Sequence, residues 1–244
     1  MKKLLLFFCA LVISTSVVAE SFPKYITLNT VGNPPLNTRD HTGFMDQVAM
    51  EAFSRLGIKL RMVKLPAERG LRNANLGIED GEMSRVEGLD KNYKNLIRVP
   101  EKIMNWNFVA FSKHSIQLNN GWNDLKPFNI AFINGWKILE KNTKGFHLIK
   151  VKTASQLFTM LRKNRTEVIL YEEWAGLFMR KKFHASEIEL LAPPLSSNPM
   201  FIYLHKKHKD LVEPLAKALQ EMKSDGSYQR YVTDILDPLR SSLK

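Results

Sequence analysis

Hydrophobic and polar positions along the chain form short apolar runs that alternate with segments of helical periodicity. Between residues 44 and 56 the apolar residues recur at the spacing of one helix face, and Gly57 follows as a helix end. The β-rich runs 24–29 and 58–63 flank this helix. Pro66 suits the first turn of another helix, which follows the second run. The opening of the chain therefore predicts the order strand, helix, strand, helix.

The same alternation continues toward the end of the chain. Further apolar runs predict buried strands at 108–111, 129–133, 168–171 and 201–204. Helical spacing recurs at 154–163, 172–182 and 211–222, and a short final helix is predicted to reach about residue 236. Alternation of strands and helices is typical of α/β layers with mainly parallel sheets. The sequence therefore predicts an α/β fold.

The first nineteen residues have the layout of a secretory signal peptide. Lys2 and Lys3 precede an apolar run at 4–13, and small residues lead to Ala19. The apolar run is about half of the roughly 20 residues that a membrane span needs. We therefore expect cleavage after Ala19 and a periplasmic location. Because the single cysteine, Cys9, lies in this leader, we expect a mature chain without disulfides or thiolate metal sites.

The chain is basic, with 36 Lys and Arg residues against 24 Asp and Glu residues and a formal net charge of +12. Export and the lack of a known nucleic-acid-binding motif argue against a nucleic-acid partner. We interpret the charge as a solvated basic surface; attraction of anionic solutes or of an anionic membrane face is the alternative. His205 and His208 are separated by two lysines and have no acidic cluster nearby, so no metal site is expected.

Several short motifs occur in a fixed order along residues 24–239. They are the proline loop at 34–35, Thr-Gly-Phe at 42–44, a Gly-x-x-Asp-Gly turn at 77–81, a strand that ends in an acid at 165–172, and Lys-Ser-Asp-Gly-Ser-Tyr at 223–228. In this order they resemble the bacterial extracellular solute-binding proteins of family 3. These are the periplasmic receptors of polar amino-acid uptake by ABC transporters, and the chain resembles a divergent member.

The resemblance implies a type II periplasmic-binding-protein-like fold, in which two α/β lobes are joined by two crossover strands. The first lobe would comprise residues 20–110 and 203–244, and the second lobe residues 111–202. The ligand would lie in the cleft between the lobes, and hinge closure is a recurring behaviour of such clefts. We expect a monomer that needs no cofactor.

Family members that bind amino acids hold the ligand carboxylate with an arginine of the first lobe. A planar guanidinium meets a carboxylate through two parallel hydrogen bonds, which lysine cannot reproduce. Arg85, with its neighbour Ser84, is the nearest match, although the usual Thr-x-Glu-Arg loop is absent. Arg69 and Arg98 are the alternatives, and an exposed loop position for Arg85 is equally consistent with the sequence.

An acid of the second lobe holds the ligand amine in the family, and Glu172 occupies that place instead of the usual aspartate. Its neighbour Glu173 is the alternative. Either acid could instead simply favour the start of the helix predicted after residue 171. The sequence alone leaves these interpretations open.

Backbone and aromatic groups complete the candidate site. Gly135 precedes a predicted helix start, where free N–H groups can bind an anion. The family usually has Thr or Ser next, whereas this chain has Trp136. Leu36 replaces the usual aromatic residue of the first loop, so Trp136, Trp106 or Trp174 would have to supply the stacking surface.

These residues favour a binding protein over an enzyme. We expect capture of a small polar or amino-acid-like solute and its delivery to a membrane ABC permease, which would be a separate chain. The first alternative is a ligand-sensing input for a membrane signalling protein. The second is a periplasmic dehydratase of the same fold that acts on prephenate-like acids, with Glu172 or Glu173 as general acid.

Overall fold

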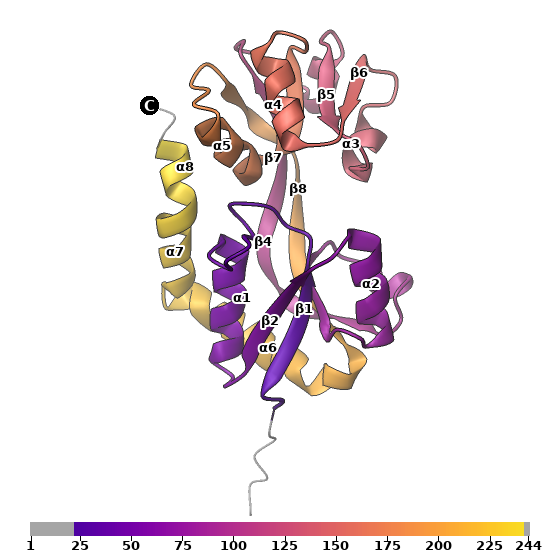
Figure 1. Cartoon of the computed structure of the whole chain (residues 1–244), viewed down its shortest axis with the longest axis vertical. Coiled ribbons are helices and arrows are strands. Elements are labelled where there is room, and N and C mark those ends of the chain that lie inside the picture. The colour runs from indigo at the N-terminus through magenta and orange to yellow at the C-terminus, as the bar shows by residue number, and fades with distance from the viewer. Residues whose placement is uncertain (1–21, 242–244) are drawn as a thin grey trace, which may run out of the picture.

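The computed structural model describes residues 22–241, so the predicted signal peptide, with Cys9, lies outside the described residues. Two groups of helices and strands are stacked end to end, with two long strands running between them (Figure 1). The first half contains β1 (Tyr25–Thr30), α1 (Phe44–Ser54), β2 (Lys59–Lys64), α2 (Ala67–Leu76), β3 (Gly81–Arg85) and α6 (Val212–Ser224). This is the predicted alternation, with β3 as an added strand.

The second half repeats the α/β pattern. It contains β5 (Ile130–Ile133), α3 (Lys137–Asn142), β6 (Leu148–Val151), α4 (Ala154–Arg162), β7 (Val168–Glu172) and α5 (Glu173–Lys182). Thr153 caps α4, because its hydroxyl accepts from the backbone N–H of Gln156 at 3.2 Å. Gly176 lets α5 lie close to the sheet, since a Cβ at this position would meet the ring of Phe111 at 2.2 Å.

Two 17-residue strands, β4 (Leu96–Ser112) and β8 (Glu189–His205), run between the halves (Figure 1). They pair with each other in antiparallel register and lie at the centre of an eight-stranded sheet of order β2-β1-β3-β8-β4-β7-β5-β6. Strand β1 is parallel to β2 and β3, and β5 is parallel to β6 and β7. The boundaries expected after residues 110 and 202 fall inside β4 and β8, and we retain that division as a proposal.

The C-terminal helices form a further link between the halves. Helix α7 (Ser227–Tyr231), a π-helical turn (Val232–Leu236) and α8 (Asp237–Ser241) follow α6 in order. They rise from the first half and end beside α5 of the second half (Figure 1). The helical segment extends past the predicted end near residue 236, because Pro238 lies in the first turn of α8, where proline is tolerated.

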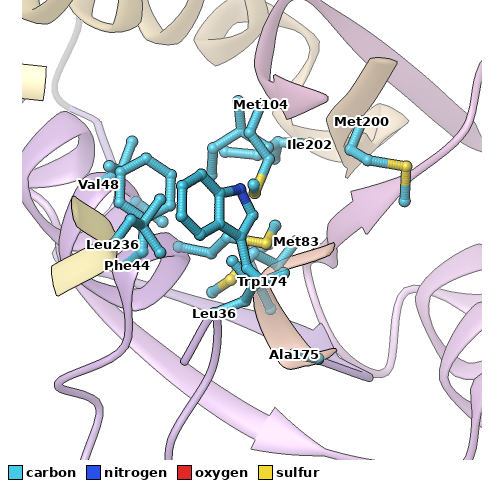
Figure 2. Close-up of a cluster of buried hydrophobic side chains, with 14 of the residues drawn as sticks. Leu36, Phe44, Val48, Met83, Met104, Trp174, Ala175, Met200, Ile202 and Leu236 are labelled. Carbon is cyan, nitrogen blue, oxygen red and sulfur yellow. The ribbon is translucent and has the colours of Figure 1, made fainter. Parts of the chain in front are cut away.

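A continuous apolar core joins the two halves beside this link. Trp174 of α5 is 7% exposed and lies among side chains of the first half, the long strands and the C-terminal segment (Figure 2). These neighbours include Leu36, Phe44, Val48, Met83, Met104, Ile202 and Leu236. Burial of a Trp side chain removes about 150–250 Å² from water, so this contact contributes substantially to holding the halves together.

No helix within residues 22–241 combines the length and the apolar character that a membrane crossing requires. Three short 3₁₀ segments, Leu89–Lys91, Gly121–Leu125 and Lys206–Leu211, complete the described secondary structure.

Candidate functional site

A cavity of about 560 Å³ lies between the two halves. The first half contributes the segment after β1 and the segment from the end of β2 into α2, the second half contributes the end of β7 and the start of α5, and β4 contributes Trp106. The lining residues are Val31, Gly32, Asn33, Leu36, Lys64, Leu65, Pro66, Ala67, Trp106, Trp136, Tyr171, Glu172 and Ala175. The cavity therefore lies at the carboxyl ends of β1, β2 and β7, where open α/β sheets bind ligands.

Aromatic rings form one wall of the cavity. The Trp136 ring stacks on Tyr171 with 5.0 Å between centroids and an interplanar angle of 25°. It also meets Phe108 edge to face at 5.5 Å. These contacts fix the Trp136 ring on two sides, so its half-buried indole presents a rigid flat surface to the cavity.

Glu172 supplies a buried carboxyl group to the cavity. It ends β7 and caps α5, since its Oε2 accepts from the backbone N–H of Ala175 at 2.7 Å. The side chain is 2% exposed, and Oε1 has no hydrogen-bond partner among the described residues. Burial raises the pKa of Glu172 to about 8, opposed by backbone hydrogen bonds from Ala175 and Trp174. The raised pKa favours the neutral acid at pH 7, and because Oε2 accepts a hydrogen bond, Oε1 is the oxygen available to carry the proton.

Two other polar groups complete the cavity wall. The indole Nε1 of Trp106 is buried and has no partner among the described residues. The Lys64 ammonium donates to Gly32 O at 2.8 Å and to Asn33 Oδ1 at 3.1 Å. An ammonium has three donors, so one N–H of Lys64 is available after these two bonds. The cavity thus combines an apolar, aromatic lining with a few hydrogen-bonding groups.

A second cavity of about 380 Å³ adjoins the first, because Asn33, Trp136 and Tyr171 line both. Its wall includes two further cations, Lys152 and Lys182. The stacked pair Trp136–Tyr171 therefore lines both spaces, and lysine side chains line each of them.

Arg85 does not line either cavity. Its guanidinium forms an ion pair with Glu82 at 2.8 Å and donates to Ala67 O at 3.1 Å. Glu82 is fully buried, so the positive charge of Arg85 is balanced inside the first half. Ser84 is also buried behind the cavity wall, and its Oγ has no partner among the described residues. Arg85 reaches the cavity only indirectly, through the backbone of Ala67, which is a lining residue.

Other candidates from the sequence lie farther away. Arg69 is exposed on α2 and lines a separate surface hollow. Arg98 pairs with Glu87 at 2.7 Å and lies over the ring of Phe201. Gly135 is exposed with a φ of +88°, and it adjoins Trp136 without lining the cavity itself.

Glu173 and Trp174 face away from the cavity. The carboxylate of Glu173 accepts from Asn107 at 2.7 Å and from Arg240 of α8 at 2.5 Å. The Arg240 guanidinium also lies 4.3 Å from the Trp174 ring centroid. These residues form an inter-half contact, which we call the anchor contact: Asn107, Glu173, Trp174, Leu236 and Arg240.

The structure thus brings Glu172, Trp106 and Trp136 together at one cavity. Sequence reasoning missed Lys64 and Tyr171, although both lie at the carboxyl ends of strands, where α/β sheets place their binding residues. Within residues 22–241, no group of three or more His, Cys, Asp or Glu side chains is arranged to hold a metal ion.

Comparison with protein families and sequences gives limited information. No family model matches the chain. An uncharacterized protein of Shewanella oneidensis MR-1 is 24% identical over an alignment of 245 positions, which covers 93% of this chain and 90% of that protein. This similarity covers nearly the whole chain without identifying its activity.

Solved structures reveal the class of fold. An ancestral arginine-binding protein bound to arginine is 20% identical, with a TM-score of 0.69 over 87% of this chain and 98% of its own. A mutant of ArgBP from T. maritima is 18% identical, with a TM-score of 0.67 over 88% and 96%. A histidine kinase sensor domain with similarity to periplasmic binding proteins is 12% identical, with a TM-score of 0.70 over 87% and 96%. The predicted periplasmic-binding-protein-like α/β fold is therefore confirmed.

Proposed function

We propose that this protein is a divergent member of the family 3 solute-binding proteins. It binds a small polar or amino-acid-like solute in the cavity between its halves. The observation that carries the proposal is that the buried polar atoms Glu172 Oε1 and Trp106 Nε1 lack partners among the described residues, and that both residues line the same cavity. Buried polar groups in proteins are nearly always satisfied, so unpartnered atoms in a cavity wall favour an external partner.

The residues that we propose to contact the solute are Glu172, Trp106, Trp136 and Lys64. Arg85 and Ser84 have a supporting role, because Arg85 holds the backbone of the cavity wall at Ala67. Arg69 and Gly135 lie away from the cavity and have no contact role in this proposal. The protein acts as a monomer without a cofactor.

The cellular role that we propose is delivery of the solute to an ABC permease in the inner membrane. The predicted signal peptide supports a periplasmic location, and the similar fold of ABC substrate-binding proteins supports a permease partner. The similarity to a histidine kinase sensor domain supports the alternative, docking of the closed form on a membrane sensor. Co-purification of the tagged protein from membranes distinguishes a permease partner from a kinase partner.

Enzymatic activity is the second alternative, and the buried Glu172 is the observation that favours it. A carboxyl group with a pKa near 8 is protonated at pH 7 and could act as general acid in a dehydration. A solute that binds and is recovered unchanged supports the receptor. A solute that is consumed at substoichiometric protein supports the enzyme.

A thermal-shift screen of the chain from Glu20 onward tests binding directly, with amino acids, polyamines and small organic acids as the panel. A solute at a hundred times its dissociation constant stabilises the folded state by about 2.7 kcal/mol. For a chain of this length we expect the unfolding midpoint to rise by roughly 5–10 °C. Glu187→Gln, on an exposed surface position, is the control and should respond like the unmodified protein. No response to any solute contradicts the proposed function.

A further inference from the structure

In the described part of the chain, the cavity lining lacks the guanidinium that best binds the carboxylate of a zwitterion. Among its described lining residues, Lys64 has a basic side chain, Glu172 has an acidic one, and arginine is absent. A zwitterionic amino acid needs an anion for its ammonium group and a cation, best a guanidinium, for its carboxylate. The arginine expected in that role, Arg85, is paired with the buried Glu82 outside the cavity.

The polar groups of the cavity wall are mainly donors. Trp106 Nε1 can only donate, and the third N–H of Lys64 also donates. Glu172 accepts from Ala175 through Oε2, so its neutral form presents an O–H at Oε1. Three donors in one cavity require acceptor atoms on the ligand, as a carboxylate provides.

The register of the sheet places two of these donors close together. In the pairing of β4 with β7, Phe108 lies opposite Glu172. Trp106 is two residues earlier on the same face of β4, so it is the diagonal neighbour of Glu172. Diagonal Cβ atoms in such a pair lie about 7–8 Å apart or less, a gap that one small planar group spans.

The rest of the lining indicates the body of the ligand. Trp136, stacked on Tyr171, offers a flat surface, and Leu36, Leu65 and Pro66 add apolar surface to the lining. Lys152 and Lys182 line the adjoining cavity and add positive potential close to the first one. A ligand with a flat or branched apolar body and a negative charge fits both the apolar lining and the positive potential.

From this geometry, and resting on the proposed function, we propose that the solute is an organic monocarboxylate with an apolar, preferably planar body. It is bound through the donors of Trp106, Glu172 and Lys64 and carries no ammonium group. The class is therefore that of aryl or branched alkyl carboxylic acids, and it excludes α-amino acids.

Matched ligands that share a body and differ in charge test this inference. The first set is 3-phenylpropionate, phenylalanine and phenethylamine, and the second set is 4-methylpentanoate, leucine and 3-methylbutylamine. We expect calorimetric titration to give an affinity for at least one carboxylate that is ten times or more that of its amino acid and amine. An amino acid or amine that binds as tightly as its matched carboxylate overturns the inference.

The pH dependence of binding gives a second test, because the affinity is expected to change in opposite directions for carboxylate and ammonium ligands. The titratable groups next to Glu172 are Tyr171 and Glu173, Lys64 lines the same cavity, and β4 contributes Trp106, Asn107 and Phe108, which do not titrate. Burial raises the pKa of Tyr171 to about 12, which leaves Glu172 as the group that ionises near pH 8. A carboxylate needs the protonated acid, so its affinity falls about tenfold between pH 7 and pH 9. An ammonium ligand would bind more tightly over the same interval.

Variants connect these effects to the named groups. Glu172→Gln should remove the fall in carboxylate affinity between pH 7 and pH 9, because the amide cannot ionise. Trp106→Phe should weaken carboxylate binding about tenfold through loss of the indole N–H. Trp122→Phe, at a position that does not line the cavity, is the matched control. A pH dependence that persists in Glu172→Gln, or a Trp106→Phe variant that binds like Trp122→Phe, overturns the inference.

The two proposals fail in different ways. If polyamines or amino acids raise the unfolding midpoint and no carboxylate of either set does so, the receptor proposal stands and the carboxylate inference is wrong. If no solute of the whole panel binds, both are wrong.

Discussion

Two neighbouring glutamates at the start of α5 belong to regions with different properties. Glu172 faces the cavity, and its Oε1 has no partner among the described residues. Glu173 belongs to the anchor contact, where Asn107 and Arg240 each donate to one of its oxygens. The tryptophans differ in the same way, since Trp174 is packed in the core while Trp106 is half-buried with an unpartnered indole nitrogen.

This difference distinguishes two surroundings of buried polar groups. At the anchor contact, the hydrogen bonds of a buried acid are completed by the chain itself. At the cavity, a buried acid and an indole are held in place without complete bonding among the described residues, which costs stability unless an external partner completes the bonds. Each prediction below tests on which side of this division a residue falls.

The largest expected effect is at the anchor contact. Trp174→Ala removes the largest side chain of the second half from the shared core, so we expect a loss of about 3–5 kcal/mol in the free energy of unfolding. Urea denaturation followed by circular dichroism measures this loss. Trp136→Ala is the matched cavity variant and should cost less stability but more solute affinity. A loss below about 1 kcal/mol for Trp174→Ala would show that the shared core does not hold the halves together.

A second variant concerns Arg85, which lies behind the cavity wall. Arg85→Ala leaves Glu82 buried without its cation, so we expect a loss of about 3 kcal/mol in unfolding free energy. Burial already raises the pKa of Glu82, and Arg85 opposes that rise. Without Arg85 the pKa rises further, so stability falls as pH rises, and the loss should be larger at pH 8 than at pH 5.

The double variant Glu82→Gln with Arg85→Ala is the control for this prediction. Because it removes the buried charge, it should recover most of the stability and lose the pH dependence. If Arg85→Ala instead unfolds like the unmodified protein while solute binding collapses, Arg85 belongs to the ligand site.

Arg240 tests the polar part of the anchor contact. Its side chain is 53% exposed, so solvent screens its charge and the loss for Arg240→Ala should be only about 1 kcal/mol. Denaturation midpoints in 0.05 M and 0.5 M NaCl should converge for this variant and the unmodified protein as salt screens the ion pair. Arg230→Ala, another exposed arginine of the C-terminal segment, is the control. Equal losses in the two variants would assign no special role to Arg240.

The smallest expected effect is at Arg69. It is exposed on α2 and outside the cavity, so Arg69→Ala should change the unfolding free energy by less than about 0.5 kcal/mol and solute affinity by less than twofold. The same titration that detects solute binding measures this. A tenfold loss of affinity for Arg69→Ala would show that the exposed face of α2 takes part in solute binding.

The sequence predicted the fold well where apolar residues were continuous. The buried runs at 129–133 and 168–171 became β5 and β7, and the terminal motif became α6 and α7. The long strands were underestimated, because β4 contains Pro100 and charged residues that interrupt the apolar pattern. The structure accommodates this part of β4 with a register shift between Arg98 and Lys102. Strand β6 escaped prediction as a four-residue strand at the sheet edge.

The site was only partly predictable for a different reason. Glu172 and Trp136 were identified from the family resemblance, at positions near the ends of buried strands, which the topology brings together. For Arg85, the open question was whether its guanidinium would bind the ligand or pair with Glu82, three residues earlier. Sequence spacing does not decide between these partners, since the bulge between Glu82 and Arg85 sets their distance.

The shared core around Trp174 has a consequence for the rates of solute exchange. A solute that enters by separation of the halves must wait until Trp174 leaves its pocket among Phe44, Met83 and Leu236. Association would then become independent of solute concentration once opening limits the rate, and dissociation would be slow for the same reason. Such a receptor retains captured solute through brief falls in supply and responds to the average concentration over the lifetime of the closed form.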